Sequence, residues 1–253
     1  MYSFFDLKDK VKRYFAFSNE EIKGMVVATL IIGFIISFKE WGYGDKFDAL
    51  VGLRNLFSSI MIVALAMLAH QTGQRIVGLH VGFRVEWRMW LYGLMIGLIL
   101  VLVSRGNLWF IAPGGIIVHH MKQHRIGYFR YGVNKWALAM IAASGAIANI
   151  LLAGFFKTIQ AWFTFIPIND ALVDKLFIFN LVFAAYSLLP IPPLDGIHLF
   201  FASRLFFAFV IGTVMGYVLL VILLGVYSYI WALIIGIIVW QTFYWTFERE
   251  AWK

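Results

Sequence analysis

The stretch LFFAFVIGTVMGYVLLVILLGVYSYIWALIIGIIVWQTFYWTF, residues 205–247, contains no Asp, Glu, Lys or Arg. A membrane-spanning helix needs roughly 20 consecutive apolar residues, so this stretch is long enough for two such helices in succession. The same bias extends over the whole chain, in which 62% of the residues are hydrophobic and 13% are charged. Because a soluble domain carries roughly 25% charged residues, the composition indicates an integral membrane protein.

Further apolar stretches predict an all-helical, polytopic membrane protein with about six transmembrane helices. The first begins at a predicted capping box formed by Ser18 and Glu21 and runs to about residue 38. The apolar segment 89–103 is only about 15 residues long, so a re-entrant or interfacial segment is predicted there. The other predicted spans are 56–74, 136–156, 172–189, 205–226 and 227–247.

The net charge of +8 comes mainly from loops beside the apolar spans, which indicates orientation in a membrane rather than binding of nucleic acid. If segment 89–103 is re-entrant and the N-terminus is cytoplasmic, 16 Lys and Arg residues lie inside and 5 outside. If the segment crosses, the division is 10 against 11. The positive-inside rule therefore predicts the re-entrant arrangement, in a multi-pass protein of the cell membrane with both termini in the cytoplasm.

Two motifs place ionisable residues at membrane depth. His70 lies near the end of the predicted span 56–74, and Asp195 follows the proline-rich run Leu189-Pro-Ile-Pro-Pro-Leu. Breaks in a helix at this depth occur inside protein or beside a water-filled cavity. In the predicted topology both residues reach the cytoplasmic leaflet, which makes them a candidate site. The alternative is that Asp195 only caps the following helix.

The run from Leu189 to Gly196 resembles the signature of site-2 proteases, the intramembrane zinc metalloprotease family. The resemblance covers about residues 56–210 and includes Pro113-Gly114-Gly115 and Ser144-Gly-Ala-Ile-Ala-Asn149, which is similar to the Gly-Pro-x-x-Asn helix of the family. Segment 83–115 resembles that of the longer prokaryotic members, particularly archaeal ones. The family fold implies a three-helix core in which zinc is bound by an aspartate and two histidines of a His-Glu-x-x-His helix, whose glutamate is the general base.

This chain departs from that motif, because His70-Gln71-Thr72-Gly73-Gln74 stands where the family has His-Glu-x-x-His. His70 and Asp195 remain as metal ligands, Gln74 occupies the position of the lost ligand, and Gln71 that of the base. Ser187 replaces an asparagine that the family usually has before the proline-rich turn. A catalytic zinc normally has three protein ligands, and an amide cannot take a proton from bound water. The resemblance therefore implies either no cofactor or weakly bound Zn²⁺.

Another residue could replace the lost ligand. Cysteine is absent from the chain, so no thiolate can do so. His198 follows Asp195 by three residues, and both could face one metal, with Glu86 as a distant candidate base. Three further histidines lie in the region that the family folds near its site, although they equally fit a solvated basic loop; they are His119, His120 and His124.

We therefore expect a non-catalytic relative, a pseudoprotease, which binds or regulates transmembrane segments of client membrane proteins in the lipid bilayer. The alternative is an active intramembrane zinc metalloprotease with a rearranged ligand set. A transporter or channel is less consistent with the few ionisable residues in the spans and the absence of an inverted repeat. The expected regions are a basic amphipathic segment (1–24), a first transmembrane helix with its loop (25–55), the site-2-protease-like core (56–210) and C-terminal transmembrane helices with a tail (211–253).

Overall fold

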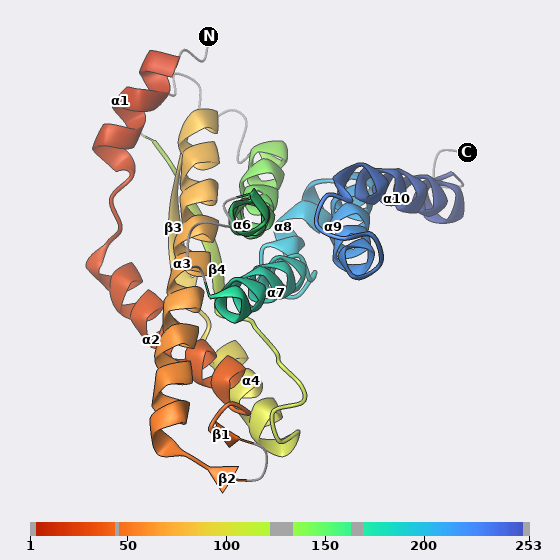
Figure 1. Cartoon of the computed structure of the whole chain (residues 1–253). Helices are drawn as coiled ribbons and strands as arrows, with labels where there is room; N and C mark the ends of the chain where they lie inside the picture. The colour runs from red at the N-terminus through yellow and green to blue at the C-terminus, as the bar shows by residue number, and fades with distance from the viewer. Residues whose placement is uncertain (1–3, 44–45, 122–133, 163–168, 250–253) are drawn as a thin grey trace.

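The computed structural model describes residues 4–43, 46–121, 134–162 and 169–249 (Figure 1). Most of these residues are helical, as the sequence predicts. The helices are α1 (Phe4–Tyr14), α2 (Asn19–Ser37), α3 (Ala49–Val81), α4 (Leu91–Val103), α6 (Lys135–Trp162), α7 (Asp170–Ser187), α8 (Gly196–Ala202), α9 (Arg204–Leu224) and α10 (Tyr229–Phe243), and a π-helical turn follows at Tyr244–Glu248.

Four helices of the described residues are long and apolar enough to cross a membrane: α3, α6, α9, and α10 together with the π-helical turn. This establishes a largely helical protein of membrane type. Helices α2 and α7 have 19 and 18 residues, but each carries three charged residues close to its start. The predicted total of about six spans depends on these two helices and stays a prediction.

Helix α3 is longer than the predicted span 56–74. It includes Arg75–Val81, which the sequence suggested to be the start of a basic loop, and it ends at Gly82. Gly82 has φ +90°, a conformation that favours glycine, and its N–H donates to the carbonyls of Gly78 and Leu79. His70 therefore lies about three turns before the end of the helix rather than about one.

A two-stranded antiparallel sheet lies where the sequence predicted only loops. Strand β3 (Phe83–Met89) pairs with β4 (Gly114–His120), so that Arg84 is opposite His119. Phe83, Val85 and Trp87 are buried, and the intervening side chains are more exposed, which is the two-residue period of a strand. The fold is thus not purely helical. A second, smaller sheet joins β1 (Gly42–Tyr43) to β2 (Lys46–Phe47).

Segment 91–113 runs out as α4 and returns as extended chain. The Trp90 N–H donates to the Pro113 carbonyl (2.8 Å), which closes the two ends together. Gly93 and Gly97 of α4 lie against the backbone of the returning segment, where a Cβ would clash. This form is the one expected of a re-entrant segment, although its depth in a membrane stays a prediction.

The turn of this hairpin corrects one sequence expectation. Residues 104–107 were expected with the inner, basic loop, on the side of β3. Instead Gly106 packs against Phe38 and Lys39 at the end of α2, and Lys39 donates a hydrogen bond to Asn107. The reason is that α4, at about 20 Å, reaches along α2 before the chain turns back. Arg105 therefore moves to the opposite end of the molecule, and this leaves the bias in loop charge largely unchanged.

A buried ion pair joins the start of α2 to α3 and β3. The predicted capping box of Ser18 and Glu21 is confirmed, and in it the Ser18 N–H donates to Glu21 Oε2 (2.7 Å). Glu21 Oε1 accepts from Arg75 Nη2 and from the Trp87 N–H (2.8 Å). The Arg75 guanidinium also lies 4.1 Å over the Phe17 ring. These contacts fix β3, and with it the Trp87 side chain.

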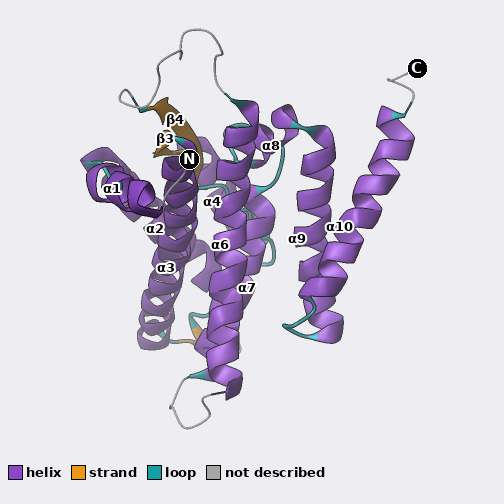
Figure 2. Cartoon of the chain, turned by 90° about the horizontal axis from the view of Figure 1, so that it is seen from above, coloured by secondary structure: helices purple, strands orange, loops and turns teal. Residues whose placement is uncertain are grey.

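The C-terminal hairpin of α9 and α10 is held by close packing at glycines. A Cβ at Gly212 or Gly216 of α9 would meet Val239 or Ile235 of α10, and Gly236 packs on Thr213 in the same way. Figure 2 shows this pair beside the bundle formed by α3, α6 and α7. Many apolar side chains of α10 are exposed, as on a helix that faces lipid.

Candidate functional site

Helices α3 and α7, the β3–β4 sheet and the proline-rich turn before α8 meet around a small buried cavity. The cavity measures about 10 Å³, which is about the space that one water molecule needs. Its walls come from segments that are far apart in the sequence. The lining residues are His70, Gln71, Trp87, Pro113, Gly114, Phe183, Ser187, Leu194 and Asp195.

His70 and Asp195 are in direct contact in this cavity. His70 Nε2 lies 2.8 Å from Asp195 Oδ2, and the two side chains are 3% and 6% exposed. The other ring nitrogen, Nδ1, lies 3.1 Å from Asn149 Oδ1, and Phe183 stacks on the ring at 4.9 Å between centroids. The imidazole is therefore held by polar partners at both nitrogens and by an aromatic face.

Small residues let α3 and α6 approach closely enough to place this histidine. Gly145 of α6 lies directly under the His70 ring, and a Cβ there would overlap the imidazole. On α3, a Cβ at Gly73 would come within 2.8 Å of Ala148 Cβ and 2.9 Å of the Ser144 carbonyl oxygen. The Ser144–Asn149 segment thus contributes both the space for His70 and the amide that contacts it.

Asp195 is not a helix cap. It occupies the N-cap position of α8, but its side chain makes no hydrogen bond to the helix N-terminus and contacts His70 instead. The capping interpretation is therefore wrong. The turn that carries Asp195 is supported by β4, because Gly115 packs against the Pro193 carbonyl with no room for a Cβ.

Gln71 and Gln74 are both buried, at 2% and 0% exposure. Gln71 lines the cavity, and its Oε1 has no hydrogen-bond partner among the described residues. Neither polar atom of Gln74 has a partner within that part of the chain. A buried amide without partners destabilises a fold by about 1–3 kcal/mol. Ser187 also lines the cavity, but its Oγ donates to the Ala184 carbonyl of its own helix.

The other candidate residues lie outside the cavity wall. His198 is on α8 and interacts with the Ile116 backbone, and burial lowers the pKa of its imidazole despite the nearby Asp195 carboxylate. Glu86 of β3 forms ion pairs with His119 (3.3 Å) and Arg84 (3.2 Å) at the surface of the sheet. His120 packs against Phe83. His124 lies outside the described residues.

The chain is 31% identical over 186 residues to a protein of Methanocaldococcus jannaschii that carries the provisional name zinc metalloprotease. The match covers 72% of this chain and 84% of that protein. The chain belongs to this zinc metalloprotease-like family. No family model matches the sequence, and no solved structure matches it either.

The name of the family raises the question of whether these residues fit zinc. A tetrahedral zinc would hold a histidine nitrogen and a carboxylate oxygen about 3.4 Å apart, so His70 and Asp195 need only separate slightly to ligate one ion. The described residues contain no group of three His, Cys, Asp or Glu side chains that could complete the site. Gln71 and Gln74 offer only neutral amide oxygens, which are not usual zinc ligands. The donor set does not fit a three-ligand catalytic zinc.

Proposed function

We propose that this chain is a site-2-protease-like, non-catalytic member of its family that binds transmembrane segments of other membrane proteins without cleaving them. One observation carries the proposal. His70 and Asp195 lie in contact in a buried cavity, while glutamine occupies both the position of the general base and that of the third ligand. The protein would act as a multi-pass component of the cell membrane with both termini in the cytoplasm.

The chemistry of the cavity supports binding rather than hydrolysis. Hydrolysis needs a group that accepts a proton from the attacking water, and the side chain on the wall beside His70 is the amide of Gln71. Glu86, the other candidate base, forms ion pairs with Arg84 and His119 on the sheet. Any Zn²⁺ would therefore be held weakly by His70 and Asp195, without a base beside it.

The retained scaffold supports a role in holding a client. A transmembrane segment that unwinds in a membrane must find hydrogen-bond partners inside protein. The cavity offers one at membrane depth, because Gln71 Oε1 is buried without a partner among the described residues. A client backbone N–H that reached Gln71 Oε1 would remove the cost of about 1–3 kcal/mol that a buried unpaired group imposes.

The second candidate is an active zinc metalloprotease with a rearranged ligand set, which the name of the M. jannaschii relative favours. In this alternative His198 would be the third metal ligand, because it is three positions from Asp195 and interacts electrostatically with its carboxylate. The two candidates differ in whether His198→Ala abolishes proteolysis of a client.

Photo-crosslinking in membranes tests the proposal. A photoreactive amino acid at Ile191, which is 40% exposed on the proline-rich turn between Ser187 and Asp195, should capture intact membrane proteins. The same probe at Ile222, which is 79% exposed on α9, serves as the control for random lipid-phase encounters. Captured clients of full length, unchanged when the chain is deleted, support the proposal. Clients that accumulate uncut only in the deletion strain contradict it and favour the protease.

A further inference from the structure

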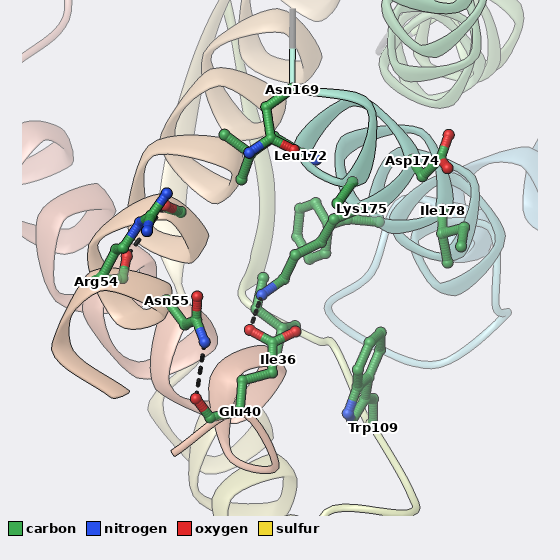
Figure 3. Close-up of a pocket in the computed structure, with 13 residues that line it drawn as sticks. Ile36, Glu40, Arg54, Asn55, Trp109, Asn169, Leu172, Asp174, Lys175 and Ile178 are labelled. Atoms are coloured by element: carbon green, nitrogen blue, oxygen red, sulfur yellow. Dashed lines mark hydrogen bonds and ion pairs between the residues drawn. The ribbon is translucent and has the colours of Figure 1, made fainter. Parts of the chain in front are cut away.

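A second and much larger cavity, of about 620 Å³, lies at the other end of α3 (Figure 3). It is bounded by the end of α2, the start of α3, the start of α7 and the returning segment after α4. The polar part of its lining consists of Glu40, Arg54, Asn55, Ser58, Asn169, Asp174 and Lys175. Arg54 is about 24 Å along α3 from His70, so this cavity is separate from the candidate site. Its volume is in the range of cavities that bind small molecules.

The charges on the wall are balanced except at Arg54. Lys175 donates to Glu40 and also to Ser59 Oγ (2.7 Å). Asp174 is paired with Lys157. Arg54 has no acidic partner among the described residues, and Figure 3 shows it on α3, on the opposite side of the cavity from Asp174 on α7. Within the part of the chain that the structure describes, the wall thus presents one guanidinium without an acidic partner, and guanidinium groups bind phosphate well.

The rest of the wall is apolar and lies on the side toward the middle of the helices. Ile36 precedes Glu40 by four residues, and Ile178 and Phe179 follow Asp174 by four and five residues, about one helical turn. Outside the cavity, Leu53 and Phe57 flank Arg54 with exposed fractions of 56% and 66%, as expected of a helix surface in contact with lipid. The cavity therefore lies at the boundary between polar and apolar surface, where the headgroup of a lipid would be.

We propose that this cavity binds an anionic phospholipid, with its phosphate at Arg54 and the first part of an acyl chain against Ile36 and Ile178. A guanidinium between membrane helices binds the phosphate of such a headgroup through its paired N–H donors. A zwitterionic lipid would bring its own cation to Arg54, and a free phosphate would leave the apolar wall uncovered. The bound lipid would contact α2, α3 and α7 at once.

Native mass spectrometry of the purified full chain tests this proposal. The chain is equilibrated with an equal mixture of phosphatidylglycerol and phosphatidylcholine in nanodiscs, and the retained lipid is identified after release. We expect phosphatidylglycerol to be retained preferentially, and Arg54→Gln to reduce that preference about fivefold. Arg105→Gln is the matched control, since Arg105 is exposed at the same end of the molecule but does not line the cavity. An unchanged preference in Arg54→Gln would overturn the proposal.

Two further measurements test whether the bound phosphate belongs to a lipid and whether that lipid lies in this cavity. Glycerol 1-phosphate should not displace the lipid at a hundredfold excess, and displacement would mean that the site takes a soluble phosphate instead. Dibrominated phosphatidylglycerol should quench the fluorescence of Trp109, which lines the cavity, so that Trp109→Phe removes part of the quenching. Equal quenching in the parent and in Trp109→Phe would place the lipid elsewhere and contradict the assignment.

Discussion

Arg75 of α3 and Glu21 of α2, separated by 54 residues, form an ion pair in which the side chains are 2% and 3% exposed. The same carboxylate accepts the backbone N–H of Trp87, whose side chain lines the His70 cavity. The N-terminal helices are therefore connected to the candidate site through a single carboxylate. This arrangement gives the first of four predictions.

Replacement of Glu21 by Gln should reduce the free energy of unfolding by about 3–5 kcal/mol, because it leaves the Arg75 charge buried without a counterion. Asp9→Asn is the matched control, since Asp9 pairs with Arg13 at the surface with exposures of 54% and 58%. Loss of such an exposed pair should change stability by less than about 1 kcal/mol. Both values are measurable by denaturant unfolding in detergent. Equal effects of the two variants would show that the buried pair has no special weight.

The double variant Gln71→Glu, Gln74→His should bind about one zinc per chain, whereas the natural protein should bind much less. The change would place three zinc-type ligands and a carboxylate base on a scaffold in which His70 already contacts Asp195. Metal analysis after purification measures it, and Asp195→Ala in the same background should abolish the gain. Cleavage should stay weak, because small errors in geometry are costly in rate. A double variant that folds but binds no more zinc than the natural protein would refute the assigned roles of positions 71 and 74.

Replacement of Gly145 by Ala should disturb the His70 site, because the added methyl would overlap the imidazole. We expect destabilisation of about 1–3 kcal/mol and loss of the zinc gained by the double variant. Gly154→Ala on the same helix is the control, since its methyl would meet only the Tyr229 hydroxyl, away from the site. Retention of zinc in the Gly145→Ala background would mean that His70 is held less tightly than the structure indicates.

Labelling of single cysteines tests the path of segment 91–113, and the chain has no cysteine to remove first. Arg84→Cys and His119→Cys should label from one side, because these residues are opposite each other in the β3–β4 sheet. Ser104→Cys should label from the other side, together with Asn169→Cys. This revises the expectation from sequence, which placed residue 104 with Arg84. If His119→Cys labels with Asn169→Cys, the segment crosses the membrane and does not return.

The sequence was informative where the signal is local. The capping box of Ser18 and Glu21 and the long apolar helices follow from spacing and composition. The second role of Glu21 could not be predicted, because its partner Arg75 is distant in sequence and had been placed in a loop. Strand β3 could have been found, since apolar and charged residues alternate from Phe83 to Arg88. That alternation was overlooked because the basic residues were interpreted as topogenic charges.

For the candidate site, the proline-rich motif and the histidine helix indicated the two residues that the structure brings into contact. Asn149 was identified only as part of a matching segment, and its contact with His70 depends on how α3 and α6 cross. The sequence also did not determine whether His198 faces the cavity. The direction of that side chain depends on the backbone of the preceding turn, which contains three prolines. The assignment of His70 and Asp195 as metal ligands stays a prediction.

The two buried glutamines also set the genetic distance between the forms of this protein. A glutamine codon becomes a glutamate codon through a change of its first base, and a histidine codon through a change of its third. Position 71 and position 74 are thus each one point mutation from the residue that hydrolysis requires, on a backbone that already brings His70 to Asp195. Under the proposed function, the zinc-binding form of this cavity and the present form are therefore separated by two base changes, and a full proteolytic rate needs further changes in geometry.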